Sequence, residues 1–223
     1  MFKFFTEKKN KNKSIMKNVL SIVHFPKDVG GRQFSGLSRV MFNISNEMRQ
    51  DKNINYVTIS TDTLFGGNYK FKNYGLISPC VILMFIKKLF NIRFYLNSIK
   101  EFYPEGLSCK FFLQYILVCS FSSLKKWDII HIHSIDHGFV LNVKNSNTKS
   151  IYTNHGVIAD EKKINNFLNI QNREKLISRK KIDFIVFVSE GAKIIWEQFY
   201  GPLKCDSLII PNAINKYFWK PLK

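Results

Sequence analysis

The sequence predicts an α/β fold: a doubly wound Rossmann-like parallel sheet with helices on both of its faces. Short, almost continuously apolar runs such as "DIIHIH" (128–133) and "DFIVFVS" (183–189) have the length and composition of buried strands. Segments with helical spacing of apolar residues separate these runs, and repeated strand–helix–strand units build parallel sheets. In such sheets ligands bind beyond the carboxyl ends of the strands, so the loops after the strands are the candidate sites.

The first half of the chain begins with a strand at 17–24, followed by a glycine-punctuated loop and a helix at 37–53. Apolar residues in that helix recur at helical spacing: Leu37, Val40, Met41, Ile44 and Met48. A second strand follows at 54–60. The stretches 78–103 and 106–127 each predict an apolar helix edged with lysine or arginine.

The second half alternates more regularly. The sequence predicts strands at 128–133, 149–155, 183–189 and 206–211. Between them it predicts helices at 136–144, 160–182 and 190–201. Ser189 stands where a serine would cap the last of these helices, since a serine hydroxyl accepts hydrogen bonds from the free N–H groups of a helix start.

The composition indicates which class of partner the protein binds. The 223 residues include 34 Lys+Arg and 16 Asp+Glu, a formal charge of +18, which attracts anions. No RNP-type aromatic motif, zinc finger or base-reading helix is recognisable, so a membrane-facing or phosphate-seeking surface is favoured over nucleic acid. The first apolar helix fits one that lies on an anionic membrane; the alternative is a core helix with snorkelling lysines. The second apolar helix, predicted over 106–127, carries apolar residues on almost every side, which favours its burial in the core.

The remaining features are those of a cytoplasmic protein, peripheral on the inner membrane face if the basic helices bind lipid. Residues 1–16 form a basic tail without the continuous apolar core of a signal peptide. The longest apolar run, Leu76–Ile86, is too short to span a bilayer. The four cysteines are scattered without a CxxC pattern, as expected of reduced core residues.

Polar residues at the predicted strand ends are the candidate site. His131 and His133 point to the same face of a strand because strand side chains alternate, and a histidine pair is also a zinc-ligand pattern. His155 ends the next strand, where an imidazole can hydrogen-bond a hydroxyl or polarise a leaving group. The loop "GGRQFSG" before the first helix would present free N–H groups to an anion, although its glycine spacing is not that of a dinucleotide fingerprint.

Five segments, in order, resemble the N-terminal half of GT-B glycosyltransferases of the family 4 type. They are "SGLSRV" (Ser35–Val40), "WDIIHIH" (Trp127–His133), "IYTNHG" (Ile151–Gly156), "FIVFVSEGAK" (Phe184–Lys193) and "IIPNAINKYFWKP" (Ile209–Pro221). The resemblance covers residues 17 to 223. It implies residues 17–210 as the acceptor-side domain and 211–223 as a truncated interdomain linker. Residues 63–127 carry no family motif, and their basic-edged apolar helices predict a helical insert that faces a membrane.

The resemblance also implies roles for individual residues. His155 would be catalytic, beside the transferred sugar and the acceptor hydroxyl. The residues that would bind donor phosphate or acceptor are Ser35, Gly36, His131, His133, Ser189 and Glu190. The family needs no metal and no cofactor; its donor is a nucleotide sugar, held mostly by a second domain that the 223 residues do not include. The resemblance therefore implies an acceptor-binding half that is a truncated gene product, a fragment or one part of a two-chain enzyme. Such a half would act on a glycan or lipid-linked acceptor in surface-polysaccharide synthesis and would be inactive alone.

Some positions depart from the family pattern, and two other functions stay open. Ser35 replaces a family glycine and Ser38 an acidic residue, while Ala213 and Asn215 replace glycine and aspartate in the linker. One alternative is a metal-dependent hydrolase that uses His131, His133, Asp136 and His155. The other is a non-catalytic, membrane-associated partner subunit.

Overall fold

The computed structural model of the chain describes residues 16–23, 36–60, 73–74, 79–88, 92–106, 108–124, 127–156, 167–180 and 182–211. Residues 1–15, 24–35 and 212–223 lie outside this part; they hold most of the basic tail, the glycine loop and the linker segment, with Ser35, Ala213 and Asn215. No helix in the described part of the chain is both long enough and apolar enough to cross a membrane.

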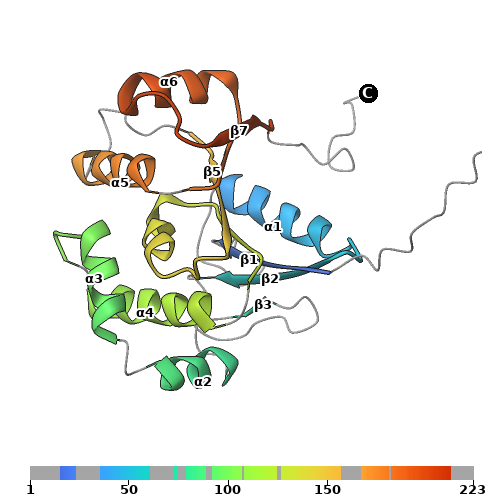
Figure 1. The fold of residues 1–223 in the computed structure, drawn as a ribbon, viewed down its shortest axis with the longest axis vertical. Helices are drawn as coiled ribbons and strands as arrows, with labels where there is room; N and C mark the ends of the chain where they lie inside the picture. Colours follow the sequence, from blue (N-terminus) through green and yellow to red (C-terminus); the bar gives the residue numbers. More distant parts are fainter. Residues whose placement is uncertain are drawn as a thin grey trace, which may run out of the picture.

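The described strands form one seven-stranded, all-parallel sheet in the order β3-β2-β1-β4-β5-β6-β7 (Figure 1). They are β1 (Lys17–Val23), β2 (Ile54–Ser60), β3 (Asn73–Tyr74), β4 (Ile129–Ile132), β5 (Lys149–Asn154), β6 (Phe184–Phe187) and β7 (Asp206–Ile209). The chain winds outward from β1 to β3, crosses back, and winds outward again from β4 to β7. The predicted doubly wound parallel sheet is therefore confirmed, and its switch point lies between β1 and β4.

The helices follow the predicted order with three differences. They are α1 (Gly36–Met48), α2 (Pro79–Lys88), α3 (Ile92–Phe102), α4 (Cys109–Leu124), α5 (Phe167–Arg179), α6 (Glu190–Tyr200) and a 3₁₀ helix, η4 (Ile135–Asn142). The single helix predicted over 78–103 is wrong: α2 packs on α4, whereas α3 packs on α4, η4 and α5, and one straight helix could not make both sets of contacts. The segment predicted as a helical insert also contributes β3, whose two residues are too few to show a periodicity. The helix predicted at 136–144 is a 3₁₀ helix.

One face of the sheet carries the main core. Figure 1 shows α1 on one side of the sheet and α3, α4, η4 and α5 together on the other. On this second side the buried side chains of the strands, such as Leu20, Ile130 and Tyr152, join those of α3, α4, η4 and α6 in one cluster. Trp196 of α6 is 1% exposed and packs against Tyr152 and Phe187. The expectation that α4 is a buried helix is confirmed for Gln114 to Ser122, whereas Phe111 and Leu113 near its start are 50% and 51% exposed.

The opposite face is covered unevenly. Over β1 and β2 it packs against α1, where Met41 and Phe42 contact Val23 and Arg49 donates to the hydroxyl of Thr58. Over β4 to β7 the apolar side chains of this face stay partly or largely exposed, whereas His133 and Thr153 near its carboxyl edge are buried; the exposed ones include Ile129, Ile151, Phe184, Val186 and Leu208. Parallel sheets are normally buried on both faces, so this bare half is the unusual feature of the fold.

Gly138 is a packing requirement of η4. A Cβ at this position would lie 2.5 Å from Phe102 Cε1 and 2.8 Å from Ile177 Cδ1, and both of those side chains are fully buried. We expect Gly138→Ala to lower the free energy of unfolding by about 1–3 kcal/mol, as overpacked core substitutions do. Urea denaturation measures this loss. Gly191→Ala, whose added Cβ would meet its nearest atom at 3.9 Å, is the control that should leave stability unchanged; equal stability of the two variants would contradict the packing argument.

Candidate functional site

Three histidines lie at the carboxyl edge of two neighbouring strands. His131 belongs to β4 and His133 follows its last residue, while His155 follows the last residue of β5. The strands pair in parallel with His131 opposite Ile151. Because strand side chains alternate, residues 131, 133, 153 and 155 share one face of the sheet, the face on which α1 packs against Val23 of β1. This edge adjoins the switch point between β1 and β4, where sheets of this type bind ligands.

The histidine rings stack on one another. The ring centroids of His131 and His133 are 3.8 Å apart, and those of His133 and His155 are 5.9 Å apart. His131 Nε2 lies 2.7 Å from the hydroxyl oxygen of Thr153. The prediction that His131 and His133 point to the same face is confirmed. The structure thus brings together His131, His133 and His155, which we call the histidine cluster.

The surroundings keep two of these imidazoles neutral. Burial, and secondarily the nearby His155, lowers the pKa of His131 to about 3. Burial also lowers the pKa of His133 well below its usual value, with smaller contributions from His131, His155 and His137. A neutral imidazole has one N–H donor and one acceptor nitrogen. Both histidines can therefore exchange hydrogen bonds with hydroxyl groups at neutral pH without carrying charge.

His133 points to a bound group. It is 2% exposed, and neither of its ring nitrogens has a hydrogen-bond partner among the described residues. Buried polar side chains are almost always hydrogen-bonded to protein or to water, so two unused ring nitrogens beside two other histidines call for an explanation. A polar ligand or an ordered water at the strand edge would supply the missing partner.

The turn after β5 fixes where His155 leaves the strand. The side-chain oxygen of Asn154 accepts a hydrogen bond of 3.0 Å from the backbone N–H of Gly156, which bends the chain directly around His155. Asn154 is itself fully buried. A side chain at Gly156 would meet no atom within 4 Å among its described surroundings, so the space beside His155 is open there.

The other predicted site residues lie apart from this cluster. Ser189 is the N-cap of α6, and its hydroxyl accepts a hydrogen bond of 3.1 Å from Ala192 N, which confirms the predicted cap. Glu190 is the first, exposed residue of α6. Both stand after β6, one strand further along the same edge. Gly36 is the first residue of α1, and Ser35 lies outside the described residues.

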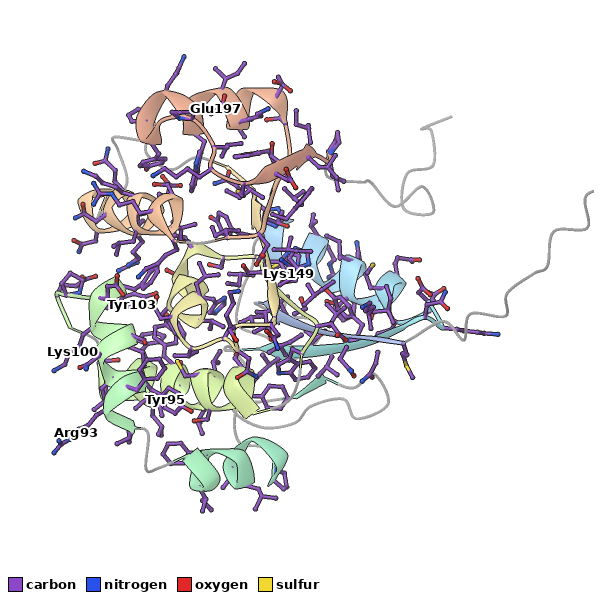
Figure 2. The ribbon with its side chains drawn as sticks, viewed as in Figure 1. Arg93, Tyr95, Lys100, Tyr103, Lys149 and Glu197 are labelled. Carbon is purple, nitrogen blue, oxygen red and sulfur yellow. The ribbon has the colours of Figure 1, made fainter. Side chains whose placement is uncertain are left out.

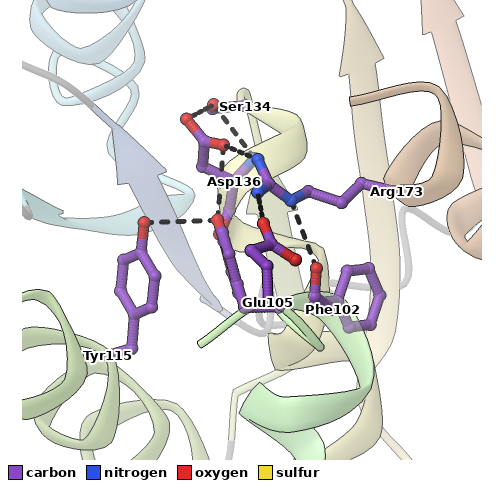
Figure 3. A network of polar contacts seen from close by, with 7 residues as sticks. Phe102, Glu105, Tyr115, Ser134, Asp136 and Arg173 are labelled. Atoms are coloured by element: carbon purple, nitrogen blue, oxygen red, sulfur yellow. Dashed lines mark hydrogen bonds and ion pairs between the residues drawn. The ribbon is translucent and has the colours of Figure 1, made fainter. Parts of the chain in front are cut away.

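Asp136 belongs to a polar network around Arg173 (Figure 3). Its carboxylate lies 3.3 Å from both Arg173 Nη1 and the Tyr103 hydroxyl, and it accepts from the Ser134 hydroxyl at 3.5 Å. Among the described residues, no three or more His, Cys, Asp or Glu side chains are arranged to hold a metal ion. Within the described part of the chain, the acidic residue that the metal-dependent hydrolase hypothesis names, Asp136, is thus held by Arg173 and Tyr103.

Sequence reasoning missed two features of this region. Thr153 is the hydrogen-bond partner of His131, and its position two residues before His155 was the signal that it shares the same face. The network around Arg173 joins segments far apart in the chain, and no local pattern announces it.

Two surface hollows lie elsewhere. One, of about 420 Å³, is lined by the ends of α5 and α6 and the loop 201–205, and one of about 260 Å³ lies between α3 and α5. Neither is lined by a residue of the histidine cluster. The strand edge is the better candidate because it combines the switch point of the sheet with unsatisfied buried nitrogens.

Comparison with known proteins adds no assignment. No family model matches this chain, and no curated protein matches it significantly.

Proposed function

We propose that this chain is the acceptor-side half of a family 4-like glycosyltransferase of the GT-B fold. It would transfer a sugar from a nucleotide-sugar donor to a glycan or lipid-linked acceptor in surface-polysaccharide synthesis, on the cytoplasmic side of a membrane. The observation that carries the proposal is the histidine cluster at the carboxyl edge of β4 and β5, beside the switch point of the sheet, with His131 and His133 held neutral by burial. The five sequence segments that resemble the family support it, because two of them supply this edge.

The side chains of the histidine cluster suit a reaction between hydroxyl-bearing substrates. In the transfer, the bond between the sugar's anomeric carbon and the donor phosphate oxygen breaks, and a bond from that carbon to the acceptor oxygen forms. The acceptor hydroxyl passes its proton to the departing nucleoside diphosphate, which then leaves. His155, at the open end of β5, is the proposed group beside the acceptor hydroxyl. His133 offers a donor and an acceptor nitrogen for sugar hydroxyls, and Thr153 orients His131 next to it.

The bare half of the sheet supports a two-part enzyme. Leu208 and Ile210 are 54% and 53% exposed on β7 and just after it, and half-buried apolar residues continue this face across β6, β5 and β4. A parallel sheet gains stability when a second layer covers such a face. We therefore assign donor binding to a further domain or a second chain, and expect turnover to need both parts.

Sugar transfer and acceptor binding test the proposal separately. The purified chain, incubated with radiolabelled nucleotide sugars and polyprenyl-phosphate-linked glycans, should show no detectable transfer; sustained turnover would refute the two-part assignment. The same acceptors, in mixed micelles, should bind the chain by calorimetry. His133→Ala should weaken this binding at least about tenfold, the cost of losing one or two hydrogen bonds in a buried site. Ile194→Gln, an exposed change on α6, is the matched control.

A lack of binding by every acceptor class, or equal binding by the His133 and Ile194 variants, would remove the histidine cluster from the proposed site. Circular dichroism of each variant shows whether a loss reflects unfolding instead. His133→Gln keeps a polar group at this position and should bind the acceptor more tightly than His133→Ala. An effect of packing alone would not produce this difference in acceptor binding.

A further inference from the structure

Three helices outside the histidine cluster expose large apolar side chains. These are Ile82, Leu83 and Ile86 on α2, Phe94 on α3, and Phe111 and Leu113 on α4, and we call them the α2–α4 apolar surface. Leu83 and Ile86 are each 55% exposed, and Phe94 is 53% exposed. Clusters of exposed apolar residues of this kind mark interaction sites on otherwise well-packed domains.

The fold does not need these side chains in its core. On α2, residues 82, 83 and 86 fall on one stripe of the helix, while Phe85, on another side, packs against the core. On α3 the core contacts come from Tyr95, Ile99 and their buried neighbours instead. Helix α2 packs on α4 and is the outermost element of this part of the molecule (Figure 1). Its apolar stripe is therefore available to a partner.

Positive charge borders this surface. Arg93 and Lys100 of α3 are exposed, and Figure 2 shows both side chains pointing away from the body of the protein. The nearby acidic residues are already neutralised, because Glu101 pairs with Lys180 and Glu105 pairs with Arg173. The chain as a whole carries a formal charge of +18. The surface thus combines apolar side chains with unneutralised cations, which matches an anionic lipid surface.

We propose that the α2–α4 apolar surface docks this chain on an anionic lipid bilayer. Its apolar side chains enter the boundary between headgroups and acyl chains, and Arg93 and Lys100 contact lipid phosphates. The helices lie on the membrane, since none of those described is long and apolar enough to span it. This docking uses neither the histidine cluster nor a sugar acceptor, so it goes beyond the proposed transfer.

Sugar-free vesicles test the docking directly. The full chain should co-sediment with vesicles of equal parts phosphatidylglycerol and phosphatidylcholine, and much less with phosphatidylcholine alone. Added salt should weaken the binding, because screening reduces the attraction between the cations and the lipid phosphates.

Two double variants separate the contribution of the apolar side chains to vesicle binding from that of the cations. Leu83→Gln with Ile86→Gln, and Arg93→Glu with Lys100→Glu, should each lower the partition coefficient about tenfold or more, as loss of buried apolar area or of two lipid-facing cations does. The controls are Ile194→Gln with Phe199→Gln, equally exposed apolar residues on α6, and Lys204→Glu, an exposed cation after α6. Both controls should bind like the unmodified chain.

Failure of the chain to bind the mixed vesicles, or equal losses in the α6 controls, would overturn the docking. So would a concentration-dependent dimer that the Leu83/Ile86 variant converts to monomer while its vesicle binding stays unchanged, because the surface would then be a contact between copies. Unfolded variants are identified by circular dichroism, and Arg93→Gln with Lys100→Gln then replaces the charge reversal. Vesicle binding and acceptor binding are measured independently, so either proposal can fail without the other.

Discussion

Lowering the pH from 7 to 5 is expected to reduce the free energy of unfolding on the order of 2 kcal/mol for each buried neutral histidine of the cluster, because the unfolded chain takes up protons that the folded chain cannot. Burial lowers the pKa of His131 to about 3 and that of His133 well below its ordinary value. Between the unfolded pKa of about 6.5 and the folded pKa, the unfolded state binds more protons. Stability is therefore constant above that window and falls as the pH drops through it.

Urea denaturation at pH 7 and pH 5 measures this loss of unfolding free energy. Two variants show whether the histidines of the cluster cause it. His131→Gln removes one of the titrating groups and should shrink the difference between pH 7 and pH 5. Asp183→Asn is the control. Burial raises the pKa of Asp183, but hydrogen bonds from Lys149 and Ser150 outweigh this and hold the pKa below its usual range. The contribution of Asp183 to the free energy of unfolding is lost only as the pH falls below about 4, the pKa of an aspartate in the unfolded chain. Asp183→Asn should therefore be less stable than the unmodified chain at both pH values, while its stability difference between pH 7 and pH 5 stays unchanged. An unchanged difference in His131→Gln would contradict this assignment.

Replacing Arg173 by methionine should cost about 2–3 kcal/mol of unfolding free energy, a loss typical of breaking a largely buried charge network. The guanidinium donates to Phe102 O at 3.2 Å, to Asp136 at 3.3 Å and to Glu105 at 2.6 Å (Figure 3). Its central carbon lies 4.0 Å from the centroid of the Tyr103 ring, a cation–π contact. The Arg173 side chain is 12% exposed, so solvent screens these contacts only in part.

The same network fixes the start of η4, the element that directly follows His133. Arg173→Lys keeps the charge but not the planar fork, so we expect an intermediate loss. The matched control is Arg179→Met on the same helix, an exposed arginine, which should change stability by less than about 0.5 kcal/mol. Thermal or urea unfolding measures all three. Equal stability of the Arg173 and Arg179 methionine variants would show that the network does not hold η4 in place.

The regular part of the fold could be predicted because its signals are local. Strands β1, β2 and β4 to β7 are short apolar runs, and α1 and α6 carry helical spacing of apolar residues, with a serine cap on α6. The break between α2 and α3 could not be predicted in this way. Both helices are apolar and lysine-edged, and what distinguishes them is their packing, α2 on α4 and α3 on α4, η4 and α5. Strand β3 needs β2 beside it to exist at all.

In the candidate site, too, local sequence predicts some features, whereas long-range packing sets the others. Alternation along a strand sufficed to place His131 and His133 on one face. That His155 joins them depends on the pairing of β4 with β5, which sequence alone suggests only through the fold class. The placement of Asp136 depends on Arg173, 37 residues further along the chain, and that contact separates the aspartate from the histidines. Distances set by long-range packing are therefore what the sequence could not supply.

The most direct test of the histidine cluster as a ligand site is ¹⁵N NMR of its imidazoles with and without a polyprenyl-phosphate-linked glycan. We predict that His131 and His133 stay neutral from pH 7 to pH 5 and that the ring nitrogens of His133 shift when the acceptor is added. Imidazoles that titrate near pH 6.5, as exposed histidines do, or His133 resonances unmoved by every acceptor would contradict the account.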